Sequence, residues 1–325
     1  MKATAIAHPN VALIKYWGRK DEMLRLPTNG SISINLSEMT TTTTVEFSDT
    51  FTTDAITIND EVITNESDRA IKHLDRIRIL AQSELKAKVV SKNNFPSSTG
   101  LSSSSSGFAA LTIAGTQALG LELSEKELSI LARLGSGSAC RSIPDGWVEW
   151  KDAETSEESY ASTIFPSDHW NLVDVVAVVS TEKKDVPTSM GQKLAQTSPF
   201  FEARQKSMQS KISELKKYIS NRRFKSFGEI IEAEALNMHA VMITSSPSLI
   251  YWSTGTLQLM KQVQKWRTEG LSAYFTINTG QDTHILVQEE NAHTLIEKLN
   301  KVSYVKKVIK NSISQGVHLS QTHLF

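Results

Sequence analysis

Alternation of apolar and polar residues predicts strands along much of the chain. Residues 31–36 (Ser-Ile-Ser-Ile-Asn-Leu) place an apolar side chain at every second position, which is the pattern of a half-buried strand. The β-branched threonines of 40–47 and the Asn-Asp-Glu turn within 55–63 also favour β-structure. The remaining predicted strands are 89–90, 147–150, 162–165, 172–179, 273–277, 283–287 and 305–310.

Helical spacing of apolar residues predicts the other elements. Within 68–81, Ile71, Leu74 and Ile77 recur every three residues and form one apolar face. Ser124 and Glu127 match a capping box, which predicts a helix from 124 to 134. The remaining predicted helices are 102–118, 200–219, 224–242, 249–266 and 291–299. This mixture indicates an α+β chain of two lobes, which we divide into 1–187 and 188–325 with the site between them.

Charge and cysteine content exclude several classes of protein. The 325 residues contain 35 Lys and Arg and 35 Asp and Glu. Binding to nucleic-acid duplexes without sequence preference requires an excess of Lys and Arg, so the balance argues against it. Cys140 is the only cysteine, so no internal disulfide forms and a reducing compartment is expected. The sequence shows no signal-peptide pattern and no run of about 18 apolar residues. We therefore predict a cytoplasmic protein without nucleic-acid or membrane partners.

The strongest candidate for chemistry is the serine- and glycine-rich segment 95–107. It leads directly into an apolar helix, so it offers hydroxyls, backbone N–H groups and the positive end of a helix dipole. That combination predicts a phosphate site, although the segment lacks the Gly-Lys-Ser/Thr of a Walker A loop. A flexible serine linker is the alternative, and the apolar residues that begin at Phe108 argue against it.

Three further segments hold polar residues in suggestive places. Segment 134–142 combines two glycines with Arg141, whose fork suits a carboxylate or phosphate, although a helix end with a surface arginine explains it equally well. In 10–20, Lys15 follows an apolar strand and either enters a cleft or returns to solvent. In 273–282, Asn278 and Asp282 follow a strand, where a simple turn is the alternative. The histidine spacing supports no zinc or di-iron site.

Together and in this order, the motifs resemble the GHMP kinase superfamily, and within it the mevalonate diphosphate decarboxylase branch. The segments that carry the resemblance are HPNVALIKYWG (8–18), LPTNGSISINL (26–36), NFPSSTGLSSSSSGFAAL (94–111), ARLGSGSACRS (132–142), VEW (148–150), KKDVPTSMG (183–191), TSPFFEAR (197–204) and AYFTINTG (273–280). The resemblance implies a GHMP kinase-like fold with an active site in a cleft between lobes, and a homodimer.

The resemblance also implies a reaction. ATP, with Mg2+, would phosphorylate the tertiary 3-hydroxyl of a 5-phosphorylated mevalonate, and loss of that phosphate and of CO2 would give an isopentenyl phosphate or diphosphate in isoprenoid biosynthesis. Such a reaction mainly requires positioning and charge placement from the protein.

Matching the family motifs assigns roles to particular residues. Arg141 would hold the substrate carboxylate, and Lys15 would lie near the transferred phosphoryl group. The ATP-binding set is Gly100, Leu101, Ser102, Ser103 and Ser104, with Ser103 also near Mg2+. The rest of the substrate-binding set is Tyr16, Arg19 (the family usually has Lys), Ser136, Ser138, Thr188 and Ser189.

Two departures from the family pattern bear on activity and substrate. Asn278 stands where the family has a catalytic aspartate, and an amide accepts no proton. We interpret this as an inactivated variant in preference to a natural member with altered chemistry. The stretch 186–189 lacks an arginine that some bacterial diphosphate enzymes carry there, and this slightly favours a 5-monophosphate over a 5-diphosphate substrate.

Two other functions compete with decarboxylation. A kinase of the same superfamily would stop at the 3-phosphate, and a silent nucleotide-binding protein would form no ADP. A structural or interaction protein is the least favoured, because it requires no separate serine-glycine clusters beside lysine and arginine.

Overall fold

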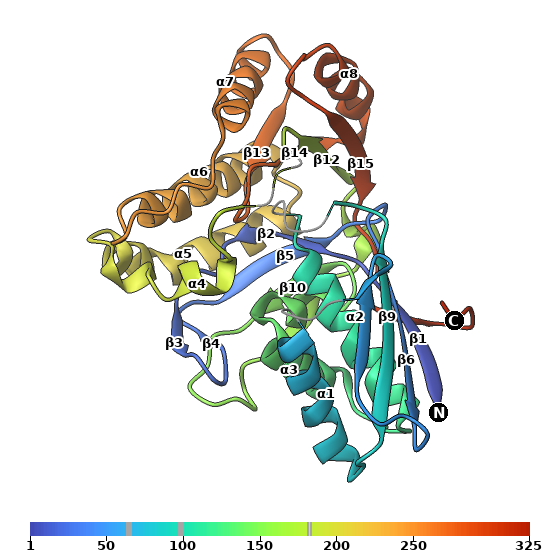
Figure 1. The fold of residues 1–325 in the computed structure, drawn as a ribbon. Coiled ribbons are helices and arrows are strands. Elements are labelled where there is room, and N and C mark those ends of the chain that lie inside the picture. The colour runs from blue at the N-terminus through green and yellow to red at the C-terminus, as the bar shows by residue number, and fades with distance from the viewer. Residues whose placement is uncertain (63–66, 97–100, 181, 183) are drawn as a thin grey trace.

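The computed structural model describes residues 1–62, 67–96, 101–180, 182 and 184–325 (Figure 1). Its mixture of sheets and helices confirms the predicted fold class. The six-stranded sheet has the order β16 (His318–Ser320), β1 (Lys2–Ala7), β6 (Thr41–Ser48), β9 (Lys86–Asn93), β7 (Ala55–Ile58), β8 (Glu61–Val62). One four-stranded sheet has the order β11 (Ala161–Phe165), β10 (Trp147–Trp150), β5 (Ser31–Asn35), β2 (Asn10–Ile14). The other has the order β13 (Ala273–Thr276), β14 (Thr283–Gln288), β12 (Leu172–Val178), β15 (Lys307–Ser312), and β3 (Arg19–Asp21) pairs with β4 (Leu26–Pro27).

The helices cover these sheets from several sides. They are α1 (Ser67–Ala81), α2 (Ser103–Ala118), α3 (Glu125–Gly135), α4 (Thr188–Gln192), α5 (Phe201–Ser220), α6 (Phe224–Ile243), α7 (Thr254–Thr268) and α8 (Glu289–Asn300). Helix α2 packs on β1 and β6 through small side chains such as Ala110 and Ala114. Helix α6 contacts both β2 and β13, so it joins two sheets (Figure 1).

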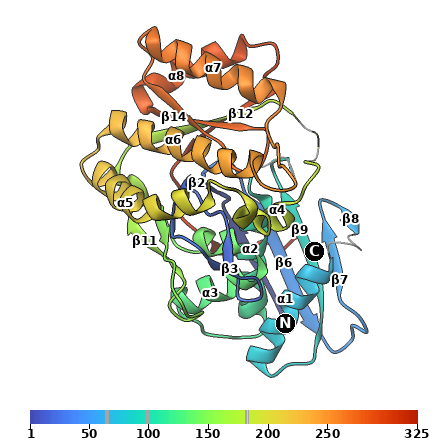
Figure 2. The ribbon, with the colours of Figure 1, turned by 90° about the vertical axis from the view of Figure 1, so that its left-hand side faces the viewer.

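The third sheet draws strands from both parts of the sequence. Strand β12 is buried along its whole length between β14 and β15, which explains its near-continuous apolar sequence. It lies before residue 187 but pairs with strands that follow it, and β16 returns to pair with β1. The two ends of the chain therefore lie close together (Figures 1 and 2). The predicted division at residue 187 stays a prediction.

Some predicted boundaries were wrong. The helix predicted for 249–266 begins at Thr254, because Ser253 caps it through the backbone N–H of Thr256. The apolar stretch at the start of the chain forms two strands in different sheets, which separate at His8 and Pro9. The strand predicted for 89–90 extends over Lys86–Asn93. By contrast, the capping box at Ser124 is confirmed.

No helix in the part of the chain that the structure describes is long and apolar enough to cross a membrane. Homodimer assembly involves a second chain and stays a prediction.

Candidate active site

The predicted site residues converge on one cavity of about 760 Å³. It lies where the end of β2, the start of α2, the 3-10 turn Gly137–Ser142, helix α4 and the segment after β13 meet. The predicted residues that line it are Lys15, Tyr16, Arg19, Ser102, Ser103, Ser104, Ser136, Ser138, Arg141, Thr188, Ser189 and Asn278. Leu101 packs in the hydrophobic core instead, and Gly100 lies outside the described residues. The placement brings the segments together, while the individual roles stay predictions.

The first turn of α2 presents backbone donors to the cavity. Ser102 precedes the helix in the left-handed region with φ of 59°, and its own side chain does not cap the helix. The first N–H groups of a helix have no partner within it, and they carry the positive end of the dipole. Ser103 and Ser104 add hydroxyls beside those groups. This end of α2 therefore suits phosphate oxygens.

Arg141 lines the cavity, and its hydrogen-bond partners among the described residues are neutral. Its Nη1 donates to Ser31 Oγ at 2.7 Å, and its Nη2 donates to Asn10 Oδ1 at 3.1 Å. The buried Nε has no hydrogen-bond partner among the described residues. Burial lowers the pKa of this guanidinium from its usual value, because the charge is removed from water. A bound carboxylate would satisfy both the charge and the free donor.

Lys15 stands at the end of β2, 1% exposed, with its ammonium at the cavity wall. Its Nζ donates to Ala12 O at 2.6 Å and to Asn278 Oδ1 at 2.9 Å. The Asn278 amide donates in turn to Ser102 Oγ at 3.3 Å. Burial lowers the pKa of Lys15 to about 7, outweighing the opposite effect of Glu234.

His239 of α6 holds the Asn278 backbone in place. Its Nε2 lies 3.0 Å from the Asn278 carbonyl oxygen, and its ring stacks on Trp252 at 4.6 Å. Burial lowers the pKa of His239 to about 3, so the ring is neutral and Nε2–H donates to that oxygen. His239 is thus a helix-face histidine with a hydrogen-bond partner.

One end of the cavity is rich in arginine. Arg19 Nε donates to Tyr16 Oη at 2.6 Å, and the Tyr16 ring packs so closely on Gly137 that a Cβ there would lie 2.9 Å from the ring. Arg25 and Arg69, which sequence reasoning missed, line the same cavity and bind the carbonyl oxygens of Leu134 and Gly135. Burial, and then Arg19 and Arg69, lower the pKa of Arg25 to about 10.

Sequence reasoning also missed Lys184, which closes another side of the cavity. Its Nζ donates to Thr188 Oγ1 at 2.7 Å and to the Thr279 carbonyl at 3.1 Å, and burial lowers its pKa to about 8. A lysine beside Thr188 in the matched segment 183–191 was the available signal. Lys20 lies outside the lining residues and pairs with Glu154 at 2.5 Å.

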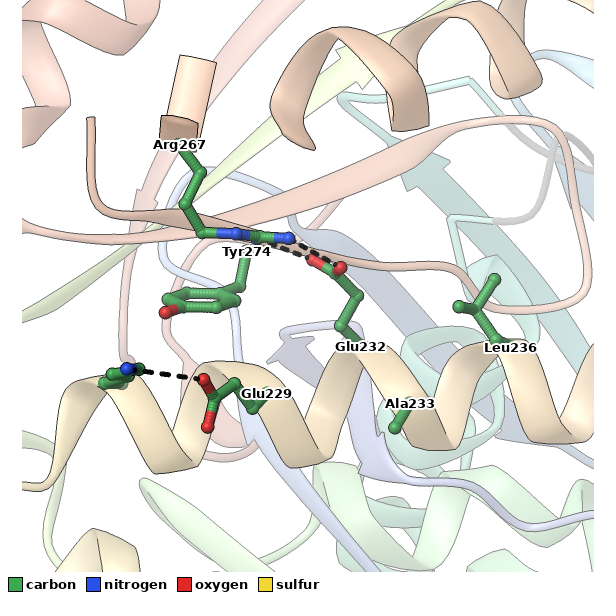
Figure 3. A pocket seen from close by; sticks show the side chains of 7 residues that line it. Glu229, Glu232, Ala233, Leu236, Arg267 and Tyr274 are labelled. Carbon is green, nitrogen blue, oxygen red and sulfur yellow. Dashed lines mark hydrogen bonds and ion pairs between the residues drawn. The ribbon is translucent and has the colours of Figure 1, made fainter. Parts of the chain in front are cut away.

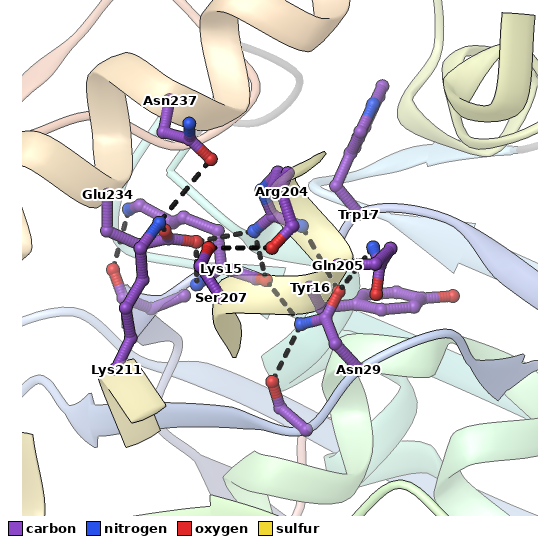
Figure 4. Close-up of polar contacts among 12 residues, drawn as sticks. Lys15, Tyr16, Trp17, Asn29, Arg204, Gln205, Ser207, Lys211, Glu234 and Asn237 are labelled. Atoms are coloured by element: carbon purple, nitrogen blue, oxygen red, sulfur yellow. Dashed lines mark hydrogen bonds and ion pairs between the residues drawn. The ribbon is translucent and has the colours of Figure 1, made fainter. Parts of the chain in front are cut away.

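Behind Lys15 lies a network of polar side chains that supports β2 (Figure 4). Arg204 of α5 is buried and forms an ion pair with Glu234 of α6. Its guanidinium also donates to Asn29 Oδ1 at 3.1 Å and to the Lys15 carbonyl at 2.9 Å. Lys211 Nζ contacts the second Glu234 oxygen at 2.8 Å. The Glu234 carboxylate is thus engaged by two other cations.

A second hollow, of about 440 Å³, lies on α6 and contains none of the predicted site residues (Figure 3). Arg267 forms a two-pronged pair with Glu232, with both N–O distances at 2.9 Å, and its guanidinium lies over the Tyr274 ring. The charges of this hollow therefore pair with one another, whereas the hydrogen-bond partners given above for Lys15 and Arg141 in the main cavity are neutral.

The comparisons with known proteins agree with this geometry. A model of the diphosphomevalonate decarboxylase-like N-terminal domain matches residues 7–161, and one of the mevalonate 5-diphosphate decarboxylase C-terminal domain matches 174–323. The diphosphomevalonate decarboxylases of Debaryomyces hansenii and Candida albicans are 34% and 33% identical to this chain. Those alignments cover 94% and 97% of this chain and 84% and 96% of the relatives.

Solved structures are similar over almost the whole chain. The mevalonate diphosphate decarboxylase of Staphylococcus aureus shares 36% identity with a TM-score of 0.92 over 98% of both chains. A structure of MDDEF in complex with MVAPP, AMPPCP and magnesium shares 36% identity with a TM-score of 0.93 over 99% of both chains.

Proposed function

The chain belongs to the diphosphomevalonate decarboxylase family and is an ATP-dependent carboxy-lyase, and on this basis we propose that its substrate is mevalonate 5-diphosphate. The observation that carries the proposal is the gathering of complementary groups in one cavity. Arg141 offers an unpaired donor to the substrate carboxylate, the arginine-rich end suits the 5-diphosphate, and the start of α2 suits the phosphates of ATP.

The choice between monophosphate and diphosphate depends on the cations at the arginine-rich end. The sequence-based preference for the monophosphate rested on the arginine missing from the stretch 186–189. Arg25 and Arg69 line the cavity as well, and Arg25 lies close enough to Arg19 and Arg69 for each to lower its pKa. A diphosphate brings more negative charge to this cluster than a monophosphate does. The relatives named above are also diphosphate enzymes.

The hydroxyls at the start of α2 fit a magnesium ion that arrives with the nucleotide. The described residues contain no group of three or more His, Cys, Asp or Glu able to hold a metal alone. Mg2+ commonly takes few protein ligands and completes its shell with phosphates and water, and Ser103 would be its protein ligand here. When bound, Mg2+ neutralises phosphate charge.

Each group of residues in the cavity would then have a separate role, set by its position. The first turn of α2 would hold the ATP phosphates, and Arg141 would fix the carboxylate so that its C–C bond breaks after the 3-phosphate has formed. Lys15 would lie beside the 3-hydroxyl that receives the phosphoryl group. The proposal takes the chain as active with Asn278, so the interpretation as an inactivated variant stays a prediction that the next experiment tests.

The test is to supply the purified chain with ATP, Mg2+ and either 5-diphosphomevalonate or 5-phosphomevalonate, and to measure CO2 and ADP together. We expect equal amounts of both products, and a kcat/KM at least about 10-fold higher for the diphosphate, since each charged contact contributes about 1.5–3 kcal/mol. Arg25→Gln and Arg69→Gln should reduce that preference. ADP without CO2 would indicate a 3-kinase, and binding without ADP would indicate a silent nucleotide-binding protein.

A further inference from the structure

We propose that Lys15, in its neutral form, accepts the proton of the substrate's 3-hydroxyl, a task for which Asn278 has no basic group. This inference rests on the proposed function and assigns the acid–base chemistry of the same site. It begins from a chemical requirement: attack of a tertiary hydroxyl on ATP must release a proton to some acceptor, and the Asn278 amide is not one.

The hydrogen bonds of Lys15 fit a neutral amine. A neutral amine has two N–H donors and one lone pair. In the part of the chain that the structure describes, the acceptors in contact with Nζ are the carbonyl oxygens of Ala12, at 2.6 Å, and of the Asn278 side chain, at 2.9 Å. With both N–H groups engaged, the lone pair is left for a group bound in the cavity, whose wall Lys15 forms.

The charges around Lys15 do not hold the proton on it. Glu234 is the acid that most raises the pKa of Lys15, but its carboxylate pairs with Arg204 and Lys211. Arg141, which lies in the 3-10 turn Gly137–Ser142, lowers the pKa of Lys15. The charged and titratable groups that face Lys15 from the surrounding elements are Glu234 and His239 of α6, Arg204 of α5, Arg141 of the 3-10 turn and Asp174 of β12. Burial outweighs the acids among them, so the pKa of Lys15 falls to about 7.

Asn278 therefore has a role in keeping Lys15 neutral. An aspartate in its place would set a carboxylate 2.9 Å from Nζ and keep the lysine charged. The amide offers the same acceptor without the charge, and His239 fixes it from behind. The absence of a carboxylate base at position 278 thus leaves its hydrogen-bonded partner Lys15 neutral and able to act as the base.

The O–H bond of the 3-hydroxyl breaks, and its proton moves to the Nζ lone pair to form an ammonium ion. The oxygen forms a bond to the γ-phosphorus of ATP while the bond from that phosphorus to ADP breaks, leaving the electron pair on ADP. The ammonium then lies beside the new 3-phosphate and returns its proton to the phosphate that departs with CO2.

The first test compares kcat/KM against pH for the native chain and Asn278→Asp, with 5-diphosphomevalonate and ATP. The kcat/KM profile reports ionisations of the free enzyme and substrate, and the substrate is the same in both variants. We expect the native acid limb near pH 7, where Lys15 becomes protonated. In Asn278→Asp the carboxylate becomes the base, so the limb should move at least about 1.5 units lower, toward ordinary carboxyl values. Coincident acid limbs would overturn the proposal.

The second test is a double-mutant cycle with Lys15→Arg, which keeps a cation but holds no usable lone pair near neutral pH. In the native background we expect a loss of about 100-fold or more in kcat/KM, the usual contribution of a general base. In the Asn278→Asp background the same substitution should lose far less. Equal losses in both backgrounds would assign Lys15 a charge role only. Lys265→Arg on the exposed face of α7 is the matched control and should leave activity unchanged.

Two further measurements keep the outcomes separate. If Lys15→Arg fails to fold, Lys15→Ala replaces it, and added ethylamine should restore activity more strongly as pH rises and the free amine accumulates. No rescue from a folded, AMPPCP-binding Lys15→Ala chain would contradict the base role. If the native chain releases no CO2 at all, the proposed function fails; if it releases CO2 without these pH effects, only the role of Lys15 fails.

Discussion

Two buried cations, Lys15 and Arg204, lie within one network but have different kinds of partner (Figure 4). Arg204 is fully buried against the equally buried carboxylate of Glu234, and its two terminal nitrogens also donate to carbonyl oxygens of Asn29 and Lys15, while its Nε has no partner among the described residues. Among the described residues, the Lys15 Nζ donates to the neutral carbonyls of Ala12 and Asn278. Arg204 is compensated and faces the protein, whereas Lys15 is uncompensated and faces the cavity.

The difference distinguishes Arg204, which supports the structure, from Lys15, which is available for the reaction. A buried charge with a carboxylate partner is satisfied and holds two helices and a strand in register. A buried charge without one keeps the capacity to bind an anion or to lose its proton. Arg141 belongs with Lys15 in this respect, because Ser31 and Asn10 are both neutral partners.

The largest expected effect is on the compensated pair. Glu234→Gln removes the carboxylate and leaves the Arg204 charge buried without a counter-ion, so we expect a loss of about 3–5 kcal/mol in unfolding free energy. Urea denaturation measures it. The matched control is Glu232→Gln, which breaks the less buried pair with Arg267 (Figure 3) and should lose at most about 1 kcal/mol. Equal losses in the two variants would show that the buried pair of Arg204 with Glu234 stabilises the chain no more than the pair of Arg267 with Glu232.

The same substitution should also affect the uncompensated cation. Glu234 raises the pKa of Lys15, so removing its charge lowers that pKa further. The acid limb of kcat/KM should therefore move to lower pH in Glu234→Gln, provided that the chain stays folded in the assay.

The next effect concerns Arg141. Arg141→Lys keeps a positive charge but loses the fork, including the buried Nε donor that has no partner among the described residues. We expect kcat/KM to fall by about 10–150-fold, which corresponds to the 1.5–3 kcal/mol of a charged hydrogen bond. Binding of AMPPCP alone should hardly change, because the nucleotide is assigned to the start of α2. An unchanged kcat/KM would remove Arg141 from substrate recognition.

Sequence patterns predicted the parts of this site that depend on local structure. The start of α3 follows from the capping box at Ser124, and the position of Lys15 follows from the end of an apolar strand. The serines before α2 combine local hydroxyls with a helix end. All of these are contiguous segments, so hydrophobic periodicity and motif spacing are enough to find them.

The remaining parts depend on packing between distant segments. Arg25 and Arg69 look like ordinary surface residues in the sequence, and they reach the cavity because their segments pack against the end of α3. Arg204 and Glu234 lie on two successive helices, and no spacing rule pairs them. Whether Lys15 is charged could not be predicted either, because its pKa depends on burial and on which acids are already paired.

A smaller effect is expected on the pH dependence of stability. Folding lowers the pKa of Lys15 from 10.5 to about 7, so above pH 7 the folded state has released a proton that the unfolded state keeps. The unfolding free energy of the native chain should therefore rise with pH relative to Lys15→Met between those values. The gain should be about 1 kcal/mol between roughly pH 7.5 and 8.5, and the dependence should vanish below pH 7, where both states hold the proton. Urea denaturation of both chains across this range measures it, and parallel curves would mean that Lys15 stays charged.

The smallest expected effect is on the unfolding free energy when Lys211, the second cation paired with Glu234, is replaced. Lys211 contacts the second oxygen of this carboxylate at 2.8 Å, but its side chain is 21% exposed. Lys211→Met leaves Arg204 paired with Glu234 and removes only a half-buried cation that water can also solvate. We expect a loss of about 0.2–1 kcal/mol, several-fold below that of Glu234→Gln, measured by urea denaturation under the same conditions. A loss as large as that of Glu234→Gln would mean that Glu234 needs both cations, and the stability of the network would then not depend on Arg204 alone.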